Sequence, residues 1–136
     1  MTEVETVANF DSLANVKSIL LTTFKKDGTP VPTPVWVAVD GDRVFMRTGA
    51  DAFKVKRIRR NPVVLLAPST SRGRPTGAAM RGHARVLGSD EEPVAERALA
   101  ARHGLLRRFY AKTVDSRLPT VYIEIGPRPV AAETPA

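Results

Sequence analysis

The sequence predicts an α+β protein built mainly on antiparallel sheet. Three observations support this prediction. Short apolar segments recur along the chain, one of them with a period of two, tight-turn sequences such as Asp27-Gly28 separate some of them, and helical periodicity is confined to a few stretches. The chain has 136 residues and shows no internal repeat or linker, so residues 1–136 are expected to form one domain.

The first part of the chain predicts a short helix and three strands. Residues 9–16 have helical spacing, and the apolar run SILLTTF follows as the first strand. A turn at Asp27-Gly28 leads into PVPTPVWVAV, whose prolines cannot donate ladder hydrogen bonds, so the start of this strand is expected at a sheet edge or to be irregular. A second turn at 40–42 leads into RVFMRT, and the three strands together predict an antiparallel meander.

The rest of the chain, after a short helix discussed below, predicts further strands and helices. The segments VVLLA and AAMRGHARVL read as strands, and Gly82 in the second marks a bulge or a close approach. Ser89 and Glu92 have capping-box spacing at the start of a helix that is expected to stop at Gly104. A second helix over LLRRFYAKT and a last strand, LPTVYIEIG, follow, and residues 126–136 are expected to be a frayed tail.

Positive charge is concentrated in one segment of the chain. The formal net charge is +7, and the segment from Arg43 to Arg85 holds eleven basic residues against one acidic residue, Asp51. Such a concentration attracts anionic partners. Charge alone leaves open whether the partner is nucleic acid, an anionic membrane surface or a phosphorylated small molecule.

Several function classes find no support. The chain has no cysteine, which excludes disulfides and thiol chemistry, and no His/Asp/Glu cluster has metal-ligand spacing. We find no nucleophile elbow, dinucleotide fingerprint or phosphate loop, and both His83 and His103 are expected to be structural. The sequence therefore predicts no catalytic side chain and no metal ligand.

Location and nucleic-acid binding can also be addressed from composition. The acidic N-terminus MTEVETVANF is no signal peptide, and no apolar run is long enough to span a membrane, so the protein is expected to be cytoplasmic. Aromatic residues make up only 6% of the chain and are not interleaved with the basic run, which argues against nucleic acid as the partner.

The strongest local signal for function is RTGADAFKVKRIRRNP, residues 47–62. A strand ends at Thr48, the next three residues supply a turn and an N-cap, and a helix begins near Asp51 or Ala52 with Lys54 in its first turn. Unpaired N–H groups and the helix dipole favour a phosphate there, and Lys54, Arg47 and Thr48 are placed to contact it. Alternatively, the basic run is only the solvated face of a surface helix. The apolar positions of this helix are Phe53, Val55 and Ile58.

The same segment resembles the phosphate-binding stretch of the pyridoxamine 5′-phosphate oxidase-like proteins, a family of split β-barrels that bind flavins and deazaflavins. The shared pattern is Thr48, Lys54, Ile58 and Asn61-Pro62. The preceding three-strand stretch, and MRGHA with its Gly-x-Ala element, are similar to the same family. The resemblance covers residues 11–125 and implies an α+β split β-barrel with short flanking helices.

Within this family the chain most resembles the oxidoreductases that use the deazaflavin coenzyme F420 (the flavin/deazaflavin oxidoreductase B group), through PTPVWVAVDGDRVFMRT followed by GADAFKVKRIRRNP. The resemblance implies hydride transfer from reduced coenzyme F420 to a small electrophile such as a quinone, an enone or a tetrapyrrole. It also implies a homodimer with the cofactor groove at its interface. Phe53 replaces an Arg of pyridoxamine 5′-phosphate oxidase itself, and GPRPVAAETPA replaces that enzyme's Arg-rich C-terminus.

The cofactor chemistry implied by the resemblance requires no catalytic side chain, because the cofactor itself carries the hydride. FMN is the alternative cofactor. A second function that the resemblance allows is a non-catalytic protein of the same fold that binds or carries FMN, coenzyme F420 or haem. The implied cofactor-binding residues are Pro34, Val35, Trp36, Arg47, Thr48, Lys54, Lys56, Arg57 and Ser69.

Overall fold

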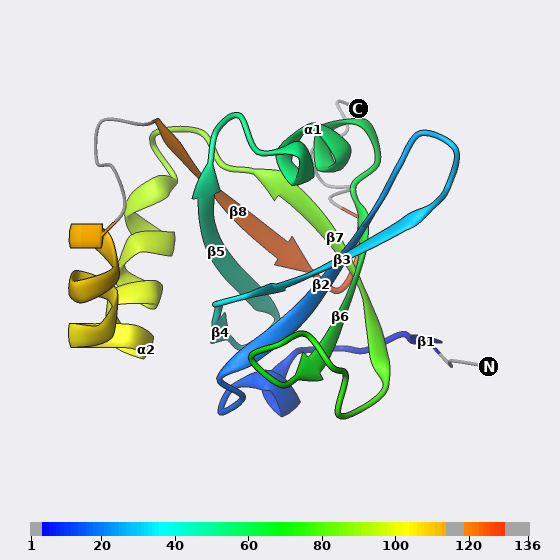
Figure 1. The fold of residues 1–136 in the computed structure, drawn as a ribbon, viewed down its shortest axis with the longest axis horizontal. Helices are drawn as coiled ribbons and strands as arrows, with labels where there is room; N and C mark the ends of the chain where they lie inside the picture. Colours follow the sequence, from blue (N-terminus) through cyan, green and yellow to red (C-terminus); the bar gives the residue numbers. More distant parts are fainter. Residues whose placement is uncertain (1–3, 114–118, 130–136) are drawn as a thin grey trace.

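The structure, a computed structural model, describes residues 4–113 and 119–129. Its elements, shown in Figure 1, are β1 (Val4–Glu5), a 3₁₀ turn η1 (Asp11–Leu13), β2 (Ser18–Phe24), β3 (Pro30–Val35), β4 (Ala38–Asp40), β5 (Arg43–Gly49), α1 (Phe53–Arg60), β6 (Val63–Ser69), β7 (Ala79–Val86), α2 (Glu92–Thr113) and β8 (Thr120–Gly126). The predicted order agrees with these elements from α1 onward, but the second predicted strand is divided into β3 and β4, the first predicted helix is only η1, and β1 was not predicted. The predicted tail falls mostly outside the described residues.

One curved sheet makes up most of the molecule. Its strand order is β3-β2-β6-β7-β8-β5-β4, every neighbouring pair in this path is antiparallel, and the two-residue β1 pairs with β7 in parallel. Hairpins form at both predicted turns, where Gly28 (φ 91°) and Gly41 (φ 63°) adopt the positive φ that glycine tolerates. The α+β expectation is therefore confirmed.

The predicted three-strand meander is wrong in its middle strand. Only Trp36 and Val37 separate β3 from β4, yet these two strands lie at opposite ends of the strand order. The prolines at every second position of β3 give a physical reason. Backbone N–H groups of alternate residues face the same strand edge, so Pro30, Pro32 and Pro34 deprive one edge of donors. β3 consequently pairs only with β2, and the chain crosses to the other end of the sheet before it pairs again.

Two apolar clusters hold the fold together. The larger fills the inside of the curved sheet and includes Val55 and Ile58 of α1, which packs against β2 and β7 at one end. The smaller lies between α2 and the outer face of β4, β5 and β8, with Phe45 and Leu99 among its buried members. Figure 1 shows α2 beside β5 and β8, on the side of the molecule away from the β2–β3 hairpin.

The helices differ in detail from the prediction. The expected helix over residues 9–16 is only the 3₁₀ turn η1, in which Leu13 is buried, as is Phe10 just before it. α2 begins at Glu92, so Ser89 lies three residues before it and is not its N-cap. The predicted stop at Gly104 is confirmed, because its φ of 49° and ψ of −123° interrupt the helix. No helix in the described ranges is both long and apolar enough to cross a membrane.

Candidate functional site

The strand pairings leave a gap in the sheet between β3 and the end of β5. β4 pairs with β5 over three residues, the first pair being Ala38 with Phe45. Continued toward β3, this register would place Trp36 opposite Arg47, but the chain turns away at Trp36 and β3 pairs with β2 instead. We call this gap the strand opening; its borders are residues 34–36 and residues 47–49.

Both borders of the strand opening are sheet edges. Among the described strands, β3 pairs only with β2, and residues 47–49 of β5 pair only with β8. Backbone groups at such edges are available to a ligand. α1 begins at Phe53, four residues after β5 ends at Gly49, so the helix start follows directly from one border of the opening.

The first turn of α1 carries Lys54, as predicted. The predicted N-cap within residues 49–51 is wrong: the N-cap is Ala52, and no side chain caps the helix. A turn hydrogen bond from Ala52 N to Gly49 O (3.1 Å) delays the helix by one residue. Val55 N donates to Ala52 O at 3.0 Å, but no side chain caps the helix, so the N–H groups of Phe53 and Lys54 remain suited to an anion.

The electrostatic setting of Lys54 also favours an anion. Burial, and to a lesser degree the nearby Arg57 guanidinium, lowers the pKa of the Lys54 amine from its ordinary value. Within the described ranges, no carboxylate forms an ion pair with Lys54. Two close cations without a carboxylate partner repel each other, and a bound anion would relieve that repulsion. The residues present therefore fit a phosphate group.

Other basic residues of α1 hold the helix to the sheet. Arg57 Nε donates to the hydroxyl of Thr23 at 2.7 Å, and Thr23 is only 1% exposed. Arg60 donates to the carbonyl of Phe24 at 3.3 Å. These contacts give the basic run a structural role that the sequence did not show. A guanidinium has five N–H donors, so Arg57 keeps donors for a ligand beside Lys54.

Lys56 and Phe53 form a pair on the exposed side of α1. The Lys56 ammonium lies 5.4 Å from the centre of the Phe53 ring, a cation–π distance. Phe53 is 72% exposed, so its assignment as an apolar packing position of the helix is wrong. The helix starts at this residue, and only the next apolar positions reach the core.

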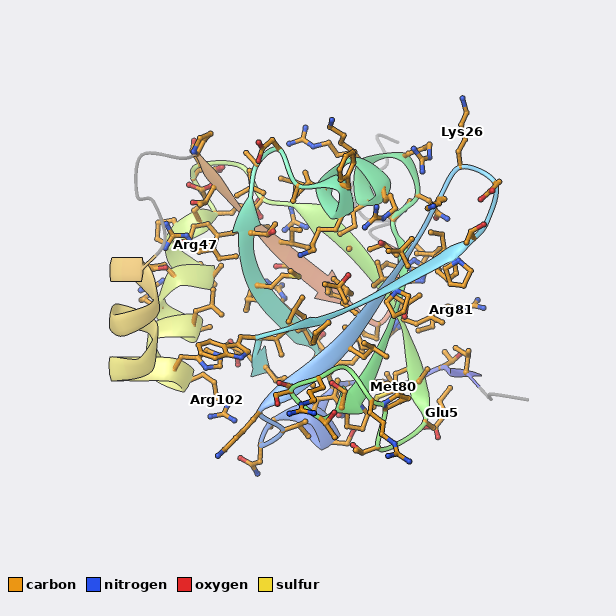
Figure 2. The ribbon with its side chains drawn as sticks, in the orientation of Figure 1. Glu5, Lys26, Arg47, Met80, Arg81 and Arg102 are labelled. Atoms are coloured by element: carbon orange, nitrogen blue, oxygen red, sulfur yellow. The ribbon has the colours of Figure 1, made fainter. Side chains whose placement is uncertain are left out.

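Arg47 and Thr48 point to opposite faces of β5, as successive strand residues must. Arg47 Nε donates to the Thr120 hydroxyl at 3.1 Å, and its guanidinium carbon lies 5.8 Å from the Tyr122 ring, so the contacts of Arg47 are with β8. Figure 2 shows Arg47 on the α2 side of β5. Thr48 pairs with Val121, which packs against the inner core. Contact of either residue with a phosphate stays a prediction.

The predicted cofactor-binding residues of the β3 border differ from one another in how far they are exposed. Val35 is buried, Pro34 is exposed on the outer face, and Trp36 is 45% exposed. Ser69 is buried at the end of β6, and its hydroxyl donates to the Thr70 carbonyl at 3.0 Å. Because β2 lies between β6 and β3, the structure does not bring Ser69 to the strand opening within one chain.

Sequence reasoning missed one contact at this border. The Trp36 indole stacks on the imidazole of His103, with ring centroids 5.5 Å apart and planes 16° from parallel. His103 Nε2 lies 2.8 Å from the Val37 carbonyl oxygen, a hydrogen bond in which the ring nitrogen donates. The sequence predicts only a structural role for His103, and no local signal could name Trp36 as its neighbour.

We also looked for a metal site in the part of the chain that the structure describes. No group of three or more His, Asp or Glu side chains there is arranged to hold a metal ion. His83 lies on β7, where burial and, second, the charge of Arg81 lower the pKa of its imidazole. The candidate site is therefore argued from the strand opening and the start of α1 themselves.

Comparison with known proteins gives the class. The sequence profile of the pyridoxamine 5′-phosphate oxidase family matches residues 6–130, nearly the whole chain. The protein therefore belongs to the pyridoxamine 5′-phosphate oxidase family, and its curved sheet with two helices is the split β-barrel that the resemblance implied. A search of curated proteins found no match.

Solved structures of similar fold carry several different descriptions. An FAD-binding protein from Mesorhizobium loti shares 16% identity (85% of this chain, 83% of that chain, TM-score 0.64). The haem storage protein HutZ from Vibrio cholerae shares 14% (85% and 84%, TM-score 0.62). An F420 reductase shares 20% (88% and 94%, TM-score 0.55). At these identities the likeness establishes the fold and leaves the cofactor of this chain open.

Proposed function

We propose that this protein is an oxidoreductase that binds reduced coenzyme F420 and transfers a hydride to a small electrophilic acceptor such as a quinone, an enone or a tetrapyrrole. The observation that carries the proposal is the half-buried Lys54 in the first turn of α1, beside Arg57 and without a carboxylate partner among the described residues. It fits the phosphate that coenzyme F420 and FMN both contain.

The strand opening suits the ring end of the same cofactor. It runs from the start of α1 along two sheet edges to Trp36, so a ligand anchored by its phosphate could lay its ring system against residues 34–36. When bound, the cofactor supplies a hydride, and a proton from solvent completes the two-electron reduction of the acceptor. The protein's own residues bind and orient the ligand.

The surrounding charge favours coenzyme F420 over FMN. Coenzyme F420 carries several carboxylates beyond its phosphate, and the segment from Arg43 to Arg85 has ten positive charges in excess. Lys56 and Arg60 on α1 and Arg74 in the loop after β6 are exposed members of this segment. They are suited to attract a polyanionic tail. FMN remains the alternative cofactor of the proposal.

We also propose a homodimer that completes the cofactor groove. On the outer face of the sheet the cross-strand rows Pro34–Leu20–Ala67 and Pro32–Thr22–Leu65 are apolar for the most part. No described helix packs on this face, in contrast to the face that α2 covers, and the loop at Gly73 approaches Leu20 and Pro34 of the first row. A second copy would cover the remainder.

A non-catalytic carrier of FMN, coenzyme F420 or haem is the second candidate, since one solved structure of similar fold is that of a haem storage protein. Turnover separates the two functions. An oxidoreductase will oxidise reduced coenzyme F420 when quinone, enone and tetrapyrrole acceptors are offered, whereas a carrier will bind the cofactor and leave it reduced.

The binding experiment uses Lys54→Ala with Lys26→Ala as a matched control. Lys26 lies at the tip of the β2–β3 hairpin and points away from α1 (Figure 2), so its substitution removes the same charge elsewhere. We expect Lys54→Ala to weaken binding of coenzyme F420 and FMN by about tenfold or more in a fluorescence titration, because a charge-assisted hydrogen bond is lost. Lys26→Ala should change affinity by less than about twofold.

The pH dependence provides a second readout. Because the pKa of Lys54 is lowered in the free protein, wild-type affinity should decline as pH rises through that lowered pKa, and Lys54→Ala should lack this decline. Equal affinity of wild type and Lys54→Ala would remove the phosphate assignment.

A further inference from the structure

The segment that joins the two ends of the sheet belongs to neither strand ladder. Pairing of β3 with β2 stops at Val35, and pairing of β4 with β5 starts at Ala38. Trp36 and Val37 therefore cross from one edge to the other without ladder hydrogen bonds. Trp36 is also the end of the border on which the ring of a cofactor would lie, and Val37 follows it directly. Whatever fixes their conformation affects the shape of that border.

His103 of α2 contacts both residues of this crossover. Its ring stacks on Trp36 at 5.5 Å and its Nε2 donates to the Val37 carbonyl at 2.8 Å. One side chain thus restrains the indole and the backbone beside it. The stacking and the hydrogen bond each contribute only a modest free energy, but together they favour one orientation of Trp36.

The local backbone places His103 where it can do this. Gly104, the next residue, interrupts α2 with a φ of 49°. The helix before the break is fixed on the sheet by buried Ala95 and Leu99, which pack with Ala38 and Phe45. His103 is therefore the last residue of a well-anchored helical segment, and its position is set by the same cluster that holds the start of β4.

We propose that His103 is a positioning residue of the cofactor site, which orients Trp36 and the crossover so that the ring of the bound cofactor can pack against them. This inference rests on the proposed function. His103 acts on the ligand through Trp36, so its contribution to affinity requires the indole to be present.

A double-mutant cycle tests this dependence. His103→Ala, Trp36→Leu and the double variant are titrated with coenzyme F420 and with FMN. Ala100→Gly serves as a control that loosens α2 at an exposed position, and the thermal midpoint of each variant is recorded. We expect His103→Ala to weaken affinity by about threefold to tenfold, the range of one or two modest contacts. That loss should vanish in the Trp36→Leu background and be absent in Ala100→Gly.

Partial variants separate the two contacts. His103→Gln keeps a donor at similar reach without the aromatic ring, and His103→Phe keeps a ring without the donor. Each should recover part of the lost affinity. Because Trp36 is the only tryptophan in the chain, its emission also reports directly whether the stack is lost.

The outcomes distinguish this inference from the proposed function. One outcome would overturn the role of His103 and leave the proposed function standing. In that outcome the wild type binds the cofactor, Lys54→Ala binds it more weakly, and His103→Ala binds it as tightly as the wild type. A loss in His103→Ala that is equally large in the Trp36→Leu background, or shared by Ala100→Gly, would overturn it too, as it would show a general effect of α2. If the wild type binds neither cofactor, both proposals fail.

Discussion

Gly82→Ala should destabilise the protein through one well-defined contact. Gly82 lies on the inner face of β7 opposite Val64, and a Cβ built on it would stand 2.5 Å from Cγ2 of Ile125. Ordinary carbon contacts are about 3.5–4.0 Å, so roughly 1 Å of space is missing. Ile125 and Val64 are both fully buried and cannot swing aside into solvent.

The magnitude follows from the cost of overpacking. Inserting a methyl group into a filled core costs about 1–3 kcal/mol, which for a domain of this size corresponds to a thermal midpoint lower by about 4–12 °C. Urea unfolding should show a lower midpoint with an unchanged slope. Adding Ile125→Leu, which removes the branch methyl at the point of contact, should recover part of the loss.

Gly126→Ala is the matched control. Gly126 is one residue from Ile125 on β8, and a Cβ there meets nothing closer than the Arg128 carbonyl at 3.8 Å. It should be neutral or slightly stabilising. If Gly82→Ala unfolds at the same urea concentration as wild type and Gly126→Ala, the close approach of β7 and β8 is not the reason for glycine at position 82.

Two further predictions concern polar contacts. The Arg85 guanidinium donates to Glu91 at 2.6 Å and lowers the pKa of that carboxyl, so this pair stabilises the fold above the ordinary carboxyl pKa and the contribution is lost as pH falls. As pH falls from about 7 to about 4, the free energy of unfolding of Glu91→Gln should therefore decrease less than that of the wild type. Equal decreases in urea unfolding would contradict a stabilising role of this ion pair. Arg57→Met leaves the buried Thr23 hydroxyl without its donor and should lower the free energy of unfolding by about 1–3 kcal/mol. Adding Thr23→Val in the same chain should restore part of this stability. An Arg57→Met variant as stable as wild type would show that other contacts hold α1 to the sheet.

The features predicted correctly from the sequence are those with local causes. Both hairpin turns follow from glycines at positions that need a positive φ, and the stop in α2 follows from Gly104. The place of Lys54 in the first turn of α1 also depends only on nearby residues. Gly82 could be flagged as a close approach, although its neighbour could not be named.

The features missed depend on distant parts of the chain. The alternating pattern through Val35, Val37 and Val39 reads as one strand, and only the pairing of β3 with β2 and of β4 with β5 shows that it is broken. Phe53 has the spacing of a core residue but lies before the helix reaches the core. The stack of Trp36 on His103 joins residues whose contact arises from α2 packing, which no short pattern encodes.

The position of β8 in the sheet has a consequence for biosynthesis. It is the last described strand along the chain, yet it lies between β7 and β5. Before it pairs, β3-β2-β6-β7 and β5-β4 are two separate ribbons, each with an unfilled lateral edge. The two ribbons can therefore be joined into one sheet only after residues 120–126 have left the ribosome. A nascent chain halted before this point exposes two strand edges that can pair with other chains, and it is at this stage that chaperone protection is most needed.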